Sequence, residues 1–158
     1  MVQSVSTIYK IHHIAFARQM APVLAERASQ FRVVVITGPR QSGKTTLCRT
    51  TFPERPFATL ESPDVRQAAE ADPRGFLARF PDGAVLDEIQ RLPALLSYLQ
   101  EDVDQNRQRG RWILTGSHQL LFMESVTQTL AGRAAVLHLL PLSLDRKSTR
   151  LNSSHATL

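Results

Sequence analysis

The feature of this 158-residue chain that most constrains its fold is a loop motif at residues 38–45. The segment reads Gly-Pro-Arg-Gln-Ser-Gly-Lys-Thr and fills every fixed position of the pattern G-x-x-x-x-G-K-S/T. An apolar run from Phe31 to Ile36 precedes the loop as a buried strand would, and Thr45 to Thr51 can form a helix directly after it. The sequence therefore predicts a strand, a tight loop and a helix in immediate succession.

Each residue type in this loop suits the binding of phosphate. Gly38 and Gly43 permit backbone angles and a close approach that a β-carbon would obstruct, so amide N–H groups can point at phosphate oxygens. The following helix opens at Lys44 and adds the positive end of its dipole. We expect the Lys44 ammonium to lie between the β- and γ-phosphates and the Thr45 hydroxyl to bind Mg²⁺, while Thr46 either packs in the helix or contacts a phosphate. The predicted nucleotide-binding residues are Gly38, Pro39, Arg40, Gln41, Ser42, Gly43, Lys44, Thr45 and Thr46.

Strands and helices alternate along the rest of the chain. Four further short apolar runs are expected strands, at residues 57–60, 83–86, 112–114 and 134–140, and helical segments separate them. A helix around Met20 is expected to pack beneath the first strand. This alternation predicts a three-layer α/β fold around a five-stranded, mainly parallel sheet.

Composition indicates one globular domain. The hydrophobic content is 42%, and no apolar run approaches the roughly 20 residues needed to span a bilayer, so we expect a cytoplasmic protein with no membrane partner. Cys48 is the only cysteine, and its place in the helix after the loop indicates packing. The net charge of +5 comes with dispersed arginines; only Arg107, Arg109 and Arg111 cluster, and we interpret that cluster as a solvated turn.

The two ends of the chain differ from the middle. Residues 1–17 show no clear period and are interpreted as a lead-in to a domain at residues 18–144. Residues 145–155 are polar and aperiodic, and they match the translation of a common sequencing-library adapter residue for residue. We therefore expect residues 145–158 to be a non-native tail, with a native C-terminal domain missing, and residues 145–155 to form no folded element; a genuine basic tail is the alternative.

Two carboxylates follow the expected third strand. In open parallel sheets ligands collect at the carboxyl ends of strands, so polar residues there are candidates for chemistry. Asp87 is suited to hold Mg²⁺ opposite Thr45, with a helix cap as the alternative. Glu88 can orient and polarise a water molecule for attack on the γ-phosphate, which favours hydrolysis. If Glu88 is only a surface residue, a small-molecule kinase becomes the better interpretation.

Polar residues beside the fourth and fifth strands complete the candidate catalytic set. Ser117 can hydrogen-bond the γ-phosphate or the attacking water, and Thr115 is the alternative for that role. Arg133 lies just before the fifth strand and is a candidate to stabilise transition-state charge in its own or a neighbouring subunit. A surface ion pair is the alternative for Arg133. The predicted catalytic residues are Lys44, Glu88, Ser117 and Arg133.

Four segments together resemble a bacterial and archaeal family of AAA-like P-loop ATPases. They are residues 38–47, 86–93, 114–117 and 130–133, which read GPRQSGKTTL, LDEIQRLP, LTGS and LAGR. The resemblance covers about residues 18–144. It implies a sheet with strand order 5-1-4-3-2, Asp87 and Glu88 as the magnesium-side and water-activating carboxylates, Ser117 at the sensor position and Arg133 near the arginine-finger position.

The same resemblance implies partners. It implies that members of this family carry a second domain of unknown function, similar to PD-(D/E)XK nucleases, which we expect to be missing from this chain. The implied partners are ATP, further copies of the chain, and DNA through the missing domain.

The first hypothesis for function is Mg²⁺-dependent ATP hydrolysis that drives or gates a C-terminal effector domain. A slowly hydrolysing nucleotide-gated switch is the alternative, and a small-molecule kinase is the third. The preference for ATP over GTP rests on the resemblance, because no N/T-K-x-D segment that reads guanine is present.

Overall fold

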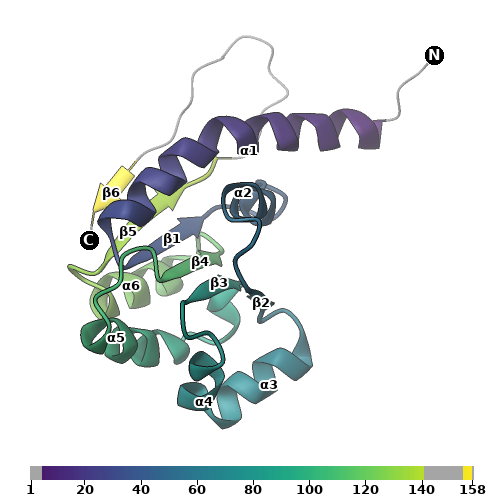
Figure 1. The fold of residues 1–158 in the computed structure, drawn as a ribbon. Coiled ribbons are helices and arrows are strands. Elements are labelled where there is room, and N and C mark those ends of the chain that lie inside the picture. The colour runs from purple at the N-terminus through teal and green to yellow at the C-terminus, as the bar shows by residue number, and fades with distance from the viewer. Residues whose placement is uncertain (1–4, 141–154, 158) are drawn as a thin grey trace.

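The computed structural model describes residues 5–140 and 155–157 (Figure 1). In chain order the elements are helix α1 (Val5–Gln30), strand β1 (Val33–Thr37), α2 (Lys44–Thr51), β2 (Phe57–Thr59), α3 (Pro63–Ala71), α4 (Pro73–Ala78), β3 (Ala84–Asp87), the 3-10 helix η1 (Ile89–Arg91), α5 (Leu95–Gln105), β4 (Trp112–Gly116), α6 (Leu120–Thr129), β5 (Ala134–His138) and β6 (His155–Thr157). The strand, loop and helix expected around residues 38–45 are present as β1, the loop and α2.

The sheet has the order β2-β3-β4-β1-β5-β6. Strands β1 to β5 are parallel to one another, so the predicted five-stranded α/β fold with strand order 5-1-4-3-2 is confirmed. Thr37 at the end of β1 is in register with Gly116 of β4 and His138 of β5. The carboxyl ends of these strands therefore meet at one edge of the sheet, which we call the carboxyl edge.

Strand β6 adds an antiparallel neighbour to β5. Thr157 pairs with Ala135 and His155 pairs with Leu137. The expectation that residues 145–155 form no folded element is therefore wrong for His155, the first residue of β6, because an unpaired strand edge accepts any short extended segment through backbone hydrogen bonds. Residues 145–154, which carry most of the adapter match, lie outside the described residues.

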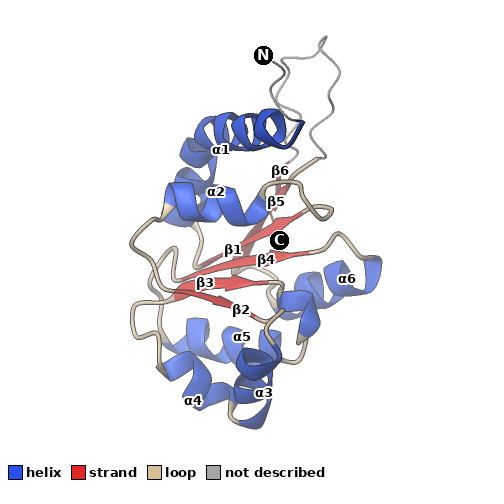
Figure 2. Ribbon diagram, turned by 90° about the vertical axis from the view of Figure 1, so that its right-hand side faces the viewer, coloured by secondary structure: helices blue, strands red, loops and turns tan. Residues whose placement is uncertain are grey.

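Two helical layers cover the sheet (Figure 2). Side chains alternate between the faces of a strand, so Val34 and Ile36 of β1 pack with α1 and α2, whereas Val33 and Val35 pack in a core with residues of α3 to α6. Cys48 lies fully buried in the core that α1 and α2 form with Val34 and Ile36, as expected for a packing residue. Burial raises the pKa of its thiol to about 12.

Helix α1 begins far earlier than the sequence indicates. We expected a lead-in through residue 17 and a helix around Met20, but α1 begins at Val5. The buried part of α1 does carry the expected contacts, since Met20 and Leu24 are buried beneath β1. Farther toward the N-terminus, Ile11 is 53% exposed and Ile14 is 38% exposed. A helix end that projects beyond the body has no buried face, so its sequence shows no amphipathic period.

The cluster of arginines before β4 is only partly solvated. Arg107 and Arg109 are exposed, but Arg111 is 6% exposed, so the interpretation as a solvated turn is wrong for Arg111. Its guanidinium donates to both carboxylate oxygens of Asp102 on α5, at 2.6 and 3.2 Å, and to the Pro81 carbonyl at 2.6 Å. A guanidinium that is paired with a carboxylate can be buried at modest cost, and the sequence pattern alone does not reveal that pairing.

Among the described residues, no helix is long and apolar enough to cross a bilayer.

Candidate nucleotide-binding site

The loop between β1 and α2 curls at the carboxyl edge of the sheet. Gly43 has φ 88° and Gln41 has φ 61°, so both adopt the left-handed conformation that turns the chain into α2. Gly38 is required by close approach: a Cβ there would lie 2.6 Å from the Leu139 carbonyl oxygen and 2.8 Å from the Ser42 hydroxyl. The two glycines therefore shape the loop by different means.

Lys44 reaches back across the loop. Its ammonium donates to the carbonyl oxygens of Gly38 and Pro39, each at 2.9 Å. An ammonium has three donors, so one N–H of Lys44 has no partner among the described residues. Burial lowers the pKa of Lys44, and the nearby carboxylates of Glu88 and Asp87 oppose that shift.

The Asp87 carboxylate accepts hydrogen bonds from hydroxyl groups on three elements. Its Oδ1 accepts from Thr45 of α2 at 3.1 Å and from Thr115 of β4 at 2.6 Å, and its Oδ2 accepts from Thr59 of β2 at 3.1 Å. The expected proximity of Thr45 and Asp87 is therefore present. Sequence reasoning missed Thr59, although its place at the end of the strand beside β3 was an available signal.

Glu88 follows Asp87 in a strained conformation. It is a non-glycine residue at φ 58°, and its backbone N–H donates to the Thr115 hydroxyl at 3.1 Å. Its carboxylate accepts a hydrogen bond from the side-chain amide of Gln90. The structure thus brings Glu88 to the same edge as Lys44 and Asp87, and it adds Gln90, which sequence reasoning did not single out.

Within the described residues, two buried hydroxyl groups at this edge have no hydrogen-bond partner. Neither Ser42 Oγ in the loop nor Ser117 Oγ after β4 makes a hydrogen bond within the described part of the chain. Helix α2 also begins without a side-chain cap in that part of the chain, which leaves the amides of its first turn toward the loop. Buried polar groups are normally hydrogen-bonded, so these groups point to a polar ligand held by the loop.

The other four predicted loop contacts are exposed or only partly buried. Thr46 is partly buried in the first turn of α2, where both expected roles stay open. Arg40 is exposed, and its guanidinium pairs with Glu61 at 3.1 Å. Pro39 and Gln41 are exposed at the turn of the loop.

Arg133 is not brought to the loop in its own chain. It precedes β5, and its carbonyl accepts from the backbone N–H of Val33 at the start of β1, so it lies at the opposite edge of the sheet. Its guanidinium donates to both oxygens of Asp104, at 2.6 and 2.8 Å, and this hydrogen bonding lowers the pKa of the Asp104 carboxyl. The ion pair, which was the alternative interpretation, is what the structure contains.

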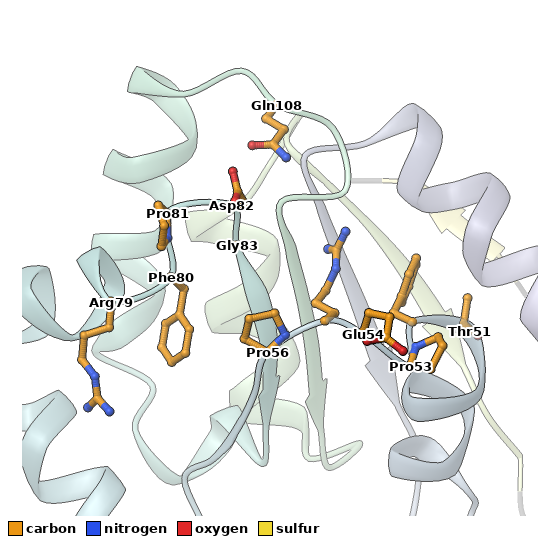
Figure 3. A pocket seen from close by; sticks show the side chains of 12 residues that line it. Thr51, Pro53, Glu54, Pro56, Arg79, Phe80, Pro81, Asp82, Gly83 and Gln108 are labelled. Atoms are coloured by element: carbon orange, nitrogen blue, oxygen red, sulfur yellow. The ribbon is translucent and has the colours of Figure 1, made fainter.

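A groove also lies away from the loop, at the amino ends of β2 and β3 (Figure 3). Its volume is about 660 Å³, and Pro56, Phe80 and Gly83 are among the residues that line it. None of the predicted site residues lines this groove.

The fold and the loop define a three-layer α/β protein of the P-loop nucleotide-binding class. A family model for the AAA domain matches residues 30–146, and the chain belongs to this family. It is therefore a nucleotide-binding domain of the P-loop ATPase class.

Two curated relatives are similar over most of this chain. They are the uncharacterized protein Rv2008c of Mycobacterium tuberculosis and the uncharacterized protein Mb2031c of Mycobacterium bovis. Each is 32% identical over 128 residues, which cover 80% of this chain and 29% of the relative. The chain thus spans less than a third of the length of these proteins.

Proposed function

We propose that this domain binds ATP with Mg²⁺ and hydrolyses the γ-phosphate, and that its nucleotide state drives or gates a C-terminal effector domain. The observation that carries the proposal is the hydrogen bond between Thr45 and Asp87, 3.1 Å long, with Glu88 next in the chain and Lys44 in the same loop. Three kinds of group that suit phosphoryl transfer therefore share one edge of the sheet: a cation, a pair of oxygen atoms proposed to bind the metal, and a second carboxylate.

The residues present fit a magnesium nucleotide. Thr45 Oγ1 and Asp87 Oδ1 are adjacent oxygen atoms of the type that Mg²⁺ prefers, either directly or through water. When bound, the metal would supply positive charge to the phosphate oxygens. The hydroxyls of Ser42 and Ser117 make no hydrogen bond to any described residue, and the first turn of α2 has no side-chain cap there; these groups fit phosphate oxygens as acceptors of hydrogen bonds.

Each predicted catalytic residue has a distinct proposed task. Lys44 uses its remaining donor on the β- and γ-phosphates. Glu88 takes a proton from the attacking water and orients it, and Ser117 contacts the γ-phosphate or that water. Arg133 is proposed only for a neighbouring subunit, because in its own chain it pairs with Asp104 at the far edge of the sheet.

The test is the substitution Glu88→Gln. The amide keeps the shape of the side chain but cannot accept the proton, so MgATP binding should persist while phosphate release falls by at least about 100-fold. Binding is measured by titration with a fluorescent ATP analogue, and turnover by phosphate release. Loss of binding together with turnover would contradict the assigned role.

A slow nucleotide-gated switch is the second candidate. The position of Arg133 at the opposite edge favours it, because the arginine proposed to stabilise transition-state charge is held away from the loop in its own chain. Single-turnover measurements separate the two: a rate equal to the no-protein control supports the switch and contradicts the hydrolase. Phosphate transfer to an added small-molecule acceptor instead of water would point to a kinase.

Further copies of this chain, and DNA reached through a further domain, are the proposed partners. The length of the curated relatives, of which this chain covers 29%, supports a further domain. The partners themselves are supported by the resemblance of the loop and carboxylate segments to two-domain ATPases.

A further inference from the structure

We infer that Gln90 is a positioning residue that holds the Glu88 carboxylate and ties it to the end of β4. The inference rests on the proposed hydrolytic function of Glu88. Gln90 lies in η1, directly after the two carboxylates, and its half-buried side chain returns toward the carboxyl edge of the sheet.

Both ends of the Gln90 amide are engaged. Its Nε2 donates to Oε2 of Glu88, and its Oε1 accepts from the backbone N–H of Ser117 at 3.2 Å. A backbone N–H can only donate, so the amide oxygen must face Ser117 and the NH₂ group must face the carboxylate. The two contacts therefore determine the orientation of the amide without ambiguity.

The surrounding backbone leaves this amide little freedom. Ile89 is fully buried, and the turn of η1 is closed by a hydrogen bond from Arg91 N–H to the Glu88 carbonyl at 3.0 Å. At Gly116, a Cβ would lie 2.6 Å from the ring of Phe122 and 3.2 Å from Gln90 Oε1. The Gln90 amide can therefore occupy this position only because residue 116 is a glycine.

Gln90 and Thr115 hold Glu88 from two sides. Thr115 accepts the backbone N–H of Glu88, and Gln90 donates to its carboxylate, so both the main chain and the side chain are held by groups associated with β4. Lys44 carries a positive charge close enough to interact with Glu88. Without the amide, the carboxylate would be drawn toward that ammonium and away from the position proposed for water activation.

Two substitutions separate the role of each amide atom. Gln90→Met removes both hydrogen bonds while keeping length, and Gln90→Glu keeps an acceptor for Ser117 N–H but removes the donor to Glu88. We expect both variants to lower kcat for MgATP by about 10- to 100-fold, in keeping with the loss of a hydrogen bond to a charged group. The MgATP dissociation constant should change by less than about threefold, because the phosphate loop is untouched. Gln67→Met, at an exposed position of α3, is the matched control and should change neither quantity.

The kinetic outcomes divide the positioning role from a structural one. If Gln90→Glu keeps the wild-type kcat while Gln90→Met lowers it, only the hydrogen bond from Ser117 N–H to Gln90 matters. The inference that Gln90 positions Glu88 then fails. Equal losses of affinity and kcat, or a fall in melting temperature that accounts for the loss of active protein, would overturn it as well.

A measurement without turnover tests the contact itself. In ¹⁵N-labelled 158-residue chain, the Gln90 side-chain amide is assigned by its absence in Gln90→Met. Glu88→Ala should shift this resonance and leave that of Gln67 in place; an unchanged Gln90 resonance would overturn the inference. If Glu88→Ala shifts the Gln90 resonance while the wild-type chain binds MgATP but releases no phosphate, the proposed hydrolysis is refuted and the placement of Glu88 by Gln90 is still supported.

Discussion

The hydroxyl of Thr37, at the end of a strand, contacts two histidine side chains. It is the last residue of β1, and its hydroxyl lies 2.7 Å from Nδ1 of His138 and 3.5 Å from Nδ1 of His118. The two imidazole rings lie edge to face, with centroids 5.0 Å apart. A pair of titratable rings therefore adjoins the residue that leads into the phosphate loop.

This arrangement makes stability depend on pH. Burial, and secondarily the charge of His118, lowers the pKa of His138. The unfolded chain, with a histidine pKa of about 6.5, then binds a proton at this position more readily than the folded chain. The contribution of His138 to the free energy of unfolding should therefore be fully present above about pH 6.5. It should decline as pH falls below that value and should be lost once pH passes the lowered pKa of His138 in the folded chain.

Urea unfolding between pH 7.5 and 5.5 tests this expectation. His138→Gln should flatten the pH dependence, because a side chain that does not titrate has no linked proton. His118→Gln should remove only the smaller part of it, since burial is the larger cause. A pH slope identical in wild type and His138→Gln would contradict the assignment.

At the scale of elements, helix α5 is fastened to β4 by a partly buried ionic network. Asp102 of α5 accepts from the guanidinium of Arg111 and from the indole N–H of Trp112 at 2.7 Å. The side chain of Arg111 is 7% exposed and that of Asp102 is 24% exposed. One residue earlier, Glu101 pairs with Arg74 on the surface, at side-chain exposures of 44% and 69%.

These adjacent acids offer a matched comparison. Asp102→Ala leaves a buried guanidinium and a buried indole N–H without their acceptor and should lower the free energy of unfolding by about 2–4 kcal/mol. Glu101→Ala removes a solvated ion pair and should have a much smaller effect. Denaturant unfolding of the two variants measures both values. Similar losses in the two would show that the network of Asp102 is no stronger than a surface pair.

At the scale of the whole molecule, the candidate site exists only where several strands end together. Thr45, Thr59, Asp87 and Thr115 come from α2, β2, β3 and β4, and the parallel sheet brings them to one edge. A ligand that bridges these elements binds the folded chain and not the unfolded one. Binding should therefore stabilise the entire domain.

Thermal unfolding with and without nucleotide tests this coupling. At a ligand concentration of 100 times Kd, MgATP should add about 2.7 kcal/mol to the free energy of unfolding and raise the melting temperature. ATP with a chelator should stabilise less, and Asp87→Asn should reduce the difference between the two conditions. Equal stabilisation with and without Mg²⁺ in the wild-type chain would contradict a metal site at Thr45 and Asp87.

Local pattern was sufficient for much of this protein. The loop at residues 38–45, the alternation of strands and helices, and the placement of Asp87 and Glu88 after a buried strand depend on short-range spacing and strand direction, so they were predictable without coordinates. Arg133 was predicted as a catalytic residue, yet its position could have been deduced from the same pattern: a residue that precedes a parallel strand lies at the edge opposite the loop that follows β1. The strand order required the resemblance to known ATPases, because pairing between distant strands leaves no local pattern.

Other features depend on contacts between distant parts of the chain. The bonds of Thr59 to Asp87 and of Gln90 to Glu88 and Ser117 form only when separate elements meet, and polar side chains that satisfy one another there look like ordinary surface residues in the sequence. The start of α1 and the pairing of β6 escaped prediction for a related reason, since neither has an amphipathic pattern of its own. Spacing along the chain was therefore enough to identify the class of protein and the residues predicted to bind phosphate. The side chains that hold those residues in position came from the folded structure alone, because their contacts depend on distance in space and not on spacing along the chain.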